Sequence, residues 1–285
     1  MKFSERYGYV KPSDVLKRSV LEKEGILGLC TCIDYLEDWL GELDRSHGRG
    51  SSATFTAIEE SIWCFFLNRR KSDFWEYSGH KTAAADCLLS GEYEWYDKID
   101  LIEYMIHQLR LRCKSYRDYQ RIINNFILLI NDTFKRLNYA YRVVDNLVVE
   151  ISDDQEVSVI EEALNQTSSV KTHLSEALKH LSNRPSPDYR NSIKESISAV
   201  EAICRELTGA TTLSEALNKL ENNGVVIPKM LKVSFEKLYA YTNDKTTGIR
   251  HALIDNTETP DYDEAKFMLV VCSAFVNYIQ YKRSV

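Results

Sequence analysis

The chain has 285 residues, of which 44% are hydrophobic and 27% are charged, a balance typical of a globular protein with room for two domains of ordinary size. No apolar run approaches the ~20 residues of a membrane-spanning helix, so no membrane partner is predicted. The first residues carry charges of both signs with no apolar segment behind them, so no secretory signal is predicted. The expected location is the cytoplasm. The net charge of −6 argues against general coating of nucleic acid, and no DNA partner is predicted, but a local basic site stays open.

Apolar residues recur at helical spacing through most of the first half of the chain. A first helix is predicted from Ile26 to Gly41, because apolar residues recur at three- and four-residue steps and the glycine is a stop signal. A loop rich in Gly, Ser and His follows at 45–52, and residues 71–81 are predicted to be irregular. Further helices are predicted over 55–66, 93–113 and 116–138.

The pattern changes at 141–151, where β-branched residues replace the helical spacing. This stretch is broken once by Asp145-Asn146, a pair that tolerates positive φ, so a single β-hairpin is predicted. The polar residues 152–156 then lead into the second half. The predicted organisation is therefore an N-terminal helical domain, residues 1–152, that ends in the hairpin, and a second domain, residues 153–285.

The second half is predicted to be a series of capped helices. Ser186-Pro187-Asp188 is expected to open the second of them with serine as the N-cap, and Gly209 to end it. Asp261 is expected to cap the last one. The predicted helices cover 157–182, 187–209, 212–224, 228–241 and 261–281. The predicted fold class is thus mainly α, with two helical domains and one β-hairpin near their boundary.

The seven cysteines are odd in number, occur mostly inside apolar stretches and never form a C-x-x-C pair. Reduced, buried thiols are therefore expected rather than disulfides or a zinc site. The sequence also contains no Gly-rich phosphate loop. No metal and no cofactor is predicted.

Two segments resemble known families. Residues 243–253, NDKTTGIRHAL, precede the last predicted helix, and an antiparallel bundle with such a segment is similar to HEPN domains. Residues 3–12, FSERYGYVKP, resemble the start of the N-terminal helical domain of AbiJ-like abortive-infection proteins. Together the two resemblances cover most of the chain. They imply a HEPN-like antiparallel bundle in the second half and a role in bacterial defence or in a toxin system.

The HEPN resemblance implies a site around Arg250. In catalytic HEPN proteins an arginine, followed by Asn, Asp or His and then by a histidine four to six residues after the arginine, cuts RNA without a metal. Arg250-His251 matches the first two positions, but Ile254, Asp255 and Asn256 stand where the second histidine belongs, and none of the six histidines has that spacing from any arginine. Either His251 is itself the acid and base beside Arg250, or the site is degenerate and both side chains are structural. Enzymatic activity is left open; if present, it is that of a metal-independent endoribonuclease.

Further residues are predicted to support the Arg250 site or to contact RNA. Glu195 and Glu201 lie on the helix that in this fold often faces the final loop, so either is expected to neutralise Arg250. Supporting roles are also expected for Asn243, Asp255 and Asn256, and an RNA contact for Lys245. A separate basic stripe steps by four, three and four residues and is interleaved with Tyr116 and Tyr119, so RNA contact is predicted for it. The stripe consists of Arg110, Lys114, Arg117 and Arg121. The alternative is a solvated helix face paired with acids such as Asp118.

Two functions follow from these patterns. The first is a defence or toxin-type effector or regulator that binds or cleaves RNA through a divergent Arg-His site, with the N-terminal domain controlling that output. The second is a non-catalytic helical interaction module: a dimerising scaffold, a sensor or an antitoxin-like regulator with a protein partner. A homodimer is expected in both cases, because HEPN-like bundles often pair and build one site from two subunits.

Overall fold

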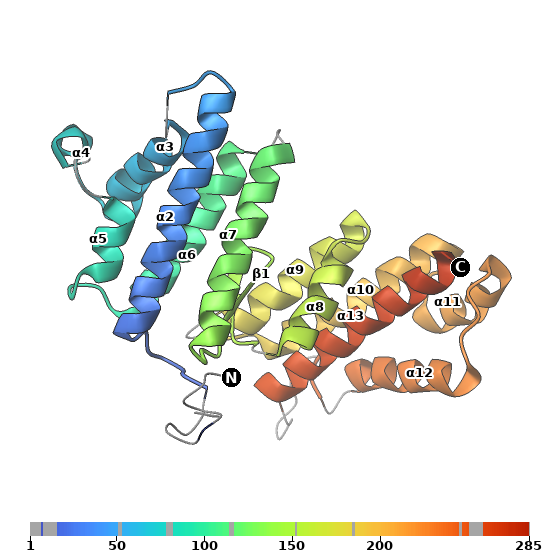
Figure 1. Ribbon diagram of the computed structural model, residues 1–285. Helices are drawn as coiled ribbons and strands as arrows, with labels where there is room; N and C mark the ends of the chain where they lie inside the picture. Colours follow the sequence, from blue (N-terminus) through green and yellow to red (C-terminus); the bar gives the residue numbers. More distant parts are fainter. Residues whose placement is uncertain are drawn as a thin grey trace. The chain divides into compact units, whose positions relative to one another are not determined.

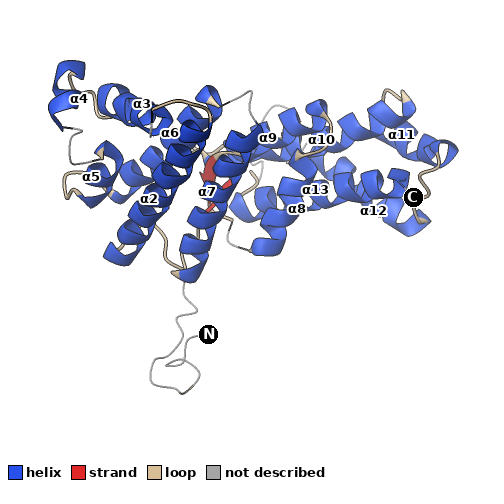
Figure 2. Cartoon of the chain, turned by 45° about the horizontal axis from the view of Figure 1, so that its top comes forward, coloured by secondary structure: helices blue, strands red, loops and turns tan. Residues whose placement is uncertain are grey.

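The computed structural model describes residues 7, 16–50, 53–77, 82–113, 117–151, 153–183, 186–244, 247–250 and 259–284. The chain divides into two compact units, Met1–Ser152 and Asp153–Val285. Among the described residues each unit is built almost entirely of helices, and one small sheet lies in the first (Figures 1 and 2). The fold is mainly α.

Three long helices form the centre of the N-terminal unit, and α7 packs against both α2 and α6 (Figure 1). Leu36 and Leu40 of α2 and Phe126 and Phe134 of α7 are fully buried, which is how the apolar stripes predicted from spacing stabilise the bundle. The helices of this unit are α2 (Lys23–Ser46), α3 (Ala53–Ser61), the π-helix η1 (Ile62–Phe66), α4 (Lys71–Tyr77), α5 (Ala83–Leu89), α6 (Trp95–Arg112) and α7 (Arg117–Arg136).

Two predictions for this unit are wrong. The first helix does not stop at Gly41 but continues to Ser46, because Gly41 is itself buried inside the bundle and tertiary packing overrides the low helix propensity of glycine. Residues 71–77 are not irregular but form α4. This short helix is held by Phe74, which is 1% exposed and whose ring centroid lies 6.2 Å from that of Trp63.

The predicted hairpin is confirmed. Strand β1 (Arg142–Val144) pairs antiparallel with β2 (Leu147–Val149), with Val143 opposite Val148. The turn residues Asp145 and Asn146 have φ values of 46° and 74°, the left-handed conformation that short hairpins require.

In the C-terminal unit the central helix α10 packs against both α9 and α13, and α8 packs against α13 (Figure 1). Ile193, Ile197 and Val200 of α10 are fully buried. The helices are α8 (Asp154–Leu164), α9 (Ser168–Ser182), α10 (Tyr189–Thr208), α11 (Leu213–Lys219), the 3-10 helix η2 (Leu220–Asn223), α12 (Lys229–Asn243) and α13 (Tyr262–Ser284).

The single helix predicted over 157–182 is in fact two. Asn165 and Gln166 donate side-chain hydrogen bonds back to the carbonyls of Glu161 and Glu162, at 2.9 and 3.2 Å. Such bonds compete with continuation of the helix, so the chain breaks before α9.

The helix caps follow the sequence closely, with one exception. The N-cap of α10 is Asp188 rather than Ser186, because the Asp188 carboxylate accepts the amide hydrogen bond of Asn191 at 3.0 Å. Gly209 ends α10 with φ of 67°, as expected for an αL cap. Asp261 caps α13 by accepting from the amides of Asp263 and Glu264 at 2.9 and 3.1 Å.

Candidate functional site

Arg250 follows a short described segment, residues 247–249, that is fixed to the bundle. Gly248 has φ of 62°, a left-handed conformation that turns the chain, and the Arg190 guanidinium at the start of α10 donates to its carbonyl. The next residue, Ile249, is 4% exposed and anchors the loop in the core. The loop therefore holds the backbone of Arg250 in one place.

The Arg250 guanidinium lies between a carboxylate and an aromatic ring. Its Nη2 donates to Oε2 of Glu201 on α10 at 3.0 Å, and its central carbon lies 5.3 Å from the ring centroid of Tyr239 on α12. The two charged side chains are 22% and 19% exposed. Nε of Arg250 is buried and has no hydrogen-bond partner among the described residues. The arginine is thus held by one carboxylate and keeps an unused buried donor.

The other supporting residues are placed differently. Glu195 does not reach Arg250; its Oε2 lies 2.7 Å from Nδ1 of His173 on α9, and its Oε1 lies 3.6 Å from Lys194. The amide of Asn243 donates to the carbonyl of Tyr239 at 3.1 Å, so it closes the last turn of α12. Of the two glutamates predicted to neutralise Arg250, Glu201 is the one that does so.

Several predicted site residues lie outside the described residues. They are His251, Lys245, Asp255, Asn256 and, in the basic stripe, Lys114 and Tyr116. The predicted partnership between Arg250 and His251 therefore stays a prediction.

The basic stripe on α6 and α7 divides into two parts. Arg110 has a structural role, because its guanidinium donates to Asn146 of the hairpin turn and to Gln120 of α7, each at 2.8 Å. Arg117 and Arg121, in contrast, are exposed and make no ion pair or side-chain hydrogen bond with any residue that the structure describes.

The prediction that Tyr119 stacks on bases is wrong. This side chain is 2% exposed, and its hydroxyl donates to Oδ1 of Asp44 at 2.8 Å. Asp44 is fully buried and also accepts from the amide and hydroxyl of Thr54, at 2.7 and 2.8 Å. Sequence reasoning missed this network, because Asp44, Thr54 and Tyr119 lie on three elements and form no local motif.

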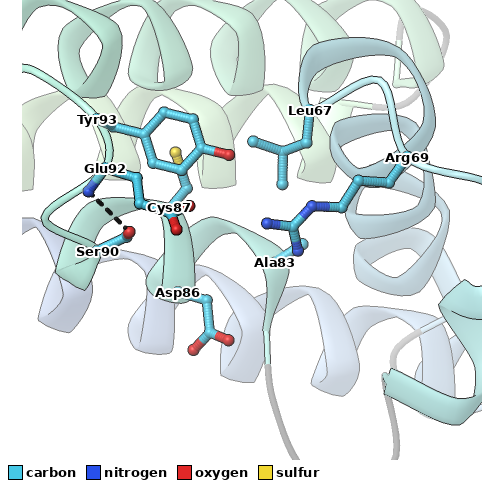
Figure 3. Close-up of a pocket in the computed structure, with 8 residues that line it drawn as sticks. All are labelled: Leu67, Arg69, Ala83, Asp86, Cys87, Ser90, Glu92 and Tyr93. Atoms are coloured by element: carbon cyan, nitrogen blue, oxygen red, sulfur yellow. Dashed lines mark hydrogen bonds between the residues drawn. The ribbon is translucent and has the colours of Figure 1, made fainter.

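A small cavity of about 160 Å³ lies between the segment that follows the π-helix, α5 and the loop between α5 and α6 (Figure 3). Arg69 and Asp86 bring opposite charges to it, and Glu92 and Tyr93 line its edge. Burial raises the pKa of the Cys87 thiol in its wall to about 11, so the thiol is protonated at neutral pH and is no nucleophile. Because its lining carries both positive and negative side chains, the cavity does not indicate a particular class of ligand.

The described part of the chain shows neither a metal site nor a membrane-spanning helix. No three His, Cys, Asp or Glu side chains there come together as ligands of a metal ion. No helix there combines the length and apolar character needed to cross a membrane.

These features define a mainly helical protein of two compact units. Arg250 in the second unit pairs with a carboxylate, whereas Arg117 and Arg121 in the first are exposed to solvent. Residues 1–166, more than half of the chain, match the family described as AbiJ N-terminal domain 4, and the chain belongs to this family. Membership associates the protein with abortive infection and confirms the resemblance carried by the opening residues. No curated protein and no solved structure matches the chain. The HEPN resemblance of the second half stays a prediction.

Proposed function

We propose that this protein serves abortive infection by acting on RNA, through Arg250 of a HEPN-like C-terminal bundle. The observation that supports this best is the state of the Arg250 guanidinium. It is oriented by Glu201 and Tyr239 and remains partly exposed. Phosphate oxygens can accept hydrogen bonds from the donors on the exposed part of this planar group.

The proposed reaction is metal-independent cleavage of an RNA strand. The ribose 2′-oxygen attacks the neighbouring phosphorus, the bond to the 5′-oxygen breaks, and the products end in a cyclic phosphate and a 5′-hydroxyl. His251 takes the proton of the 2′-hydroxyl and returns one to the leaving oxygen, because a histidine titrates near neutral pH. Arg250 stabilises the charge that develops on the phosphate. Glu201 positions the guanidinium.

Arg250→Ala and His251→Ala should each reduce cleavage of total RNA in EDTA by about 10²–10³-fold, because each removes a group that stabilises charge or transfers a proton in the transition state. The measurement is the rate at which the purified full chain degrades RNA. Arg205→Ala is the matched control, since this exposed arginine lies on α10 of the same unit and has no side-chain partner among the described residues.

Loss of the fold is separated from loss of the site by a second variant. Arg250→Lys keeps the positive charge beside Glu201 but loses the planar fork, so it should keep the melting temperature and lose most of the cleavage. Cleavage that persists in both alanine variants contradicts the proposed site.

A second candidate function is the non-catalytic interaction module, acting as a dimerising scaffold, a sensor or an antitoxin-like regulator. Helix α12 supports it, because its buried residues among those described are Phe235 and Thr242, whereas Met230 is 74% exposed and Leu231 36%. Exposed neighbouring apolar side chains of this kind are typical of contact surfaces. Absence of RNA cleavage under all conditions would favour this function.

Both functions predict a homodimer. We expect light scattering at micromolar concentration to give twice the mass of the chain, and Met230→Ser/Leu231→Ser to shift the protein toward the monomer because the substitutions remove apolar contact area. Leu128→Ser is the control, since Leu128 is 65% exposed on α7 of the other unit. A monomeric unmodified protein would contradict the dimer and any site composed from two subunits.

A further inference from the structure

Positive charge gathers at one end of the N-terminal unit. This end is formed by the last turn of α2 with the loop that follows it, the last turns of α6 and the start of α7, which lie together at the upper end of the unit in Figure 1. We call it the basic end. Its arginines are Arg45, Arg49, Arg110, Arg112, Arg117 and Arg121.

Side-chain contacts hold the three elements of the basic end together. Nη1 of Arg49, in the loop after α2, donates to the hydroxyl of Tyr119 on α7 at 3.2 Å, and the ring centroid of His47 lies 6.1 Å from that of Tyr119. Nη1 of Arg110 on α6 donates to Gln120 on α7 at 2.8 Å. The ends of the three elements therefore lie together, and their arginines are gathered at one end of the unit.

The fold explains only some of these charges. Arg45 and Arg112 lie in the last turns of α2 and α6, where the helix macrodipole favours cations. Arg117 is the first residue of α7 and Arg121 lies one turn later, so the dipole of their helix acts against them. None of these four side chains has an ion pair or hydrogen bond with the described residues, although the chain as a whole carries a net charge of −6.

Two acids, Asp44 and Asp118, lie within the elements of the basic end, and neither forms an ion pair with a described arginine. Asp44 is fully buried, and its carboxylate is occupied by Thr54 and Tyr119. Asp118 is exposed and is one charge among six arginines. The buried Asp44 network joins α2, α3 and α7 beneath the surface. The backbone that carries the arginines is therefore already ordered, so little backbone entropy is lost when a ligand binds.

We propose that the basic end binds the phosphodiester backbone of a nucleic acid. Arginines present planar forks of donors that match phosphate oxygens two at a time, and unpaired exposed guanidinium groups on one rigid surface supply several such contacts. That the nucleic acid is RNA rests on the proposed function. Because the basic end lies in the N-terminal unit, the proposal gives that unit a nucleic-acid-binding role that is separate from the site at Arg250.

The test is fluorescence anisotropy of the full chain with a labelled 20-nucleotide RNA of mixed sequence and 2′-O-methyl sugars. This probe keeps the phosphate backbone but lacks the 2′-hydroxyl that cleavage needs, so binding is measured whether or not the protein cleaves RNA. The variant is Arg45→Gln/Arg112→Gln/Arg117→Gln/Arg121→Gln. We expect its affinity to fall by roughly tenfold or more at 0.15 M salt, and the slope of log Kobs against log salt to fall by up to about 3.

The control variant is Lys23→Gln/Arg136→Gln, which removes exposed cations from the opposite ends of α2 and α7 in the same unit. It should bind as the unmodified protein does, and both variants should keep the melting curve of tryptophan fluorescence. Equal affinity and salt slope for the fourfold variant and the control would overturn the proposal, as would binding to phosphatidylserine vesicles in place of the RNA.

Failure of RNA binding at the basic end can be distinguished from failure of RNA cleavage at Arg250. Arg250→Ala should leave binding of the 2′-O-methyl RNA within about twofold, since one phosphate contact of many contributes little, whereas the fourfold basic-end variant should lose it. Tighter binding of a duplex DNA of the same sequence would assign the backbone to DNA and contradict the choice of RNA. It would not bear on cleavage at Arg250.

Discussion

Asp44→Ala is expected to lower the free energy of unfolding of the N-terminal unit by about 3–5 kcal/mol. The Asp44 carboxylate is fully buried and accepts three hydrogen bonds of 2.7–2.8 Å, from the amide and hydroxyl of Thr54 and from the hydroxyl of Tyr119. Removing it leaves these buried donors without their acceptor, and the desolvation cost of each is then uncompensated. The variant should also loosen the basic end, because the same network joins α2, α3 and α7.

Urea unfolding followed by tryptophan fluorescence measures this effect, since all four tryptophans precede residue 100 and report on the N-terminal unit. Asp44→Asn keeps one acceptor oxygen and should cost less than the alanine variant. Tyr119→Phe removes one donor and should cost about 1 kcal/mol. A loss below 1 kcal/mol for Asp44→Ala would mean that the network does not stabilise the fold.

Replacing Glu59 by Gln is expected to make the N-terminal unit less sensitive to pH between about 5 and 8. Glu59 on α3 is 5% exposed, and burial raises the pKa of its carboxyl to about 7. The carboxylates of Glu37 and Asp86 contribute to this increase in pKa, while the amides of Ala83 and Ala84 at the start of α5 oppose it by donating to the carboxylate.

The direction of the effect follows from linkage. A carboxyl whose pKa is higher in the folded than in the unfolded state contributes stability that is fully present below the unfolded pKa and is lost as pH rises through the folded pKa. For Glu59 this window runs from 4.5 to about 7. The free energy of unfolding of the unmodified protein should therefore fall relative to Glu59→Gln by about 3 kcal/mol across the window.

The measurement is urea unfolding by tryptophan fluorescence at pH 5 and pH 8 for both proteins. Other carboxyls with raised pKa values, such as Glu103 and Asp100, are present in both proteins and cancel in the comparison. Glu92→Gln is the control, since this exposed glutamate shows no comparable burial. Parallel pH profiles for the unmodified protein and Glu59→Gln would contradict the expected role of Glu59.

Local signals in the sequence predicted most of the helices, the hairpin and most caps. Hairpin turns need residues that accept positive φ, and Asp145-Asn146 meets that need within two positions of the chain. Asp261 and Gly209 likewise act on backbone groups a few residues away. The failures at Gly41 and Phe74 occurred where distant contacts override local preference, because the bundle keeps both residues helical.

The candidate site was predictable in its types of residue but not in its pairings. Arg250 with Glu201 agrees with expectation, but Glu195 contacts His173 instead. Both glutamates lie on α10, and their separation of six positions places them on different sides of that helix, so helix packing decides which one meets Arg250.

The sequence by itself determined a mainly helical chain, a hairpin near residue 145 and membership of a family associated with abortive infection, because periodicity, turn chemistry and family motifs are local properties. The tertiary structure alone decided which arginines are neutralised and which stay open. Arg110 and Arg117 look equivalent along the chain, yet one is bonded to the hairpin and the other faces solvent. Charge pairing depends on distances between side chains far apart in sequence, and those distances exist only after the helices have packed.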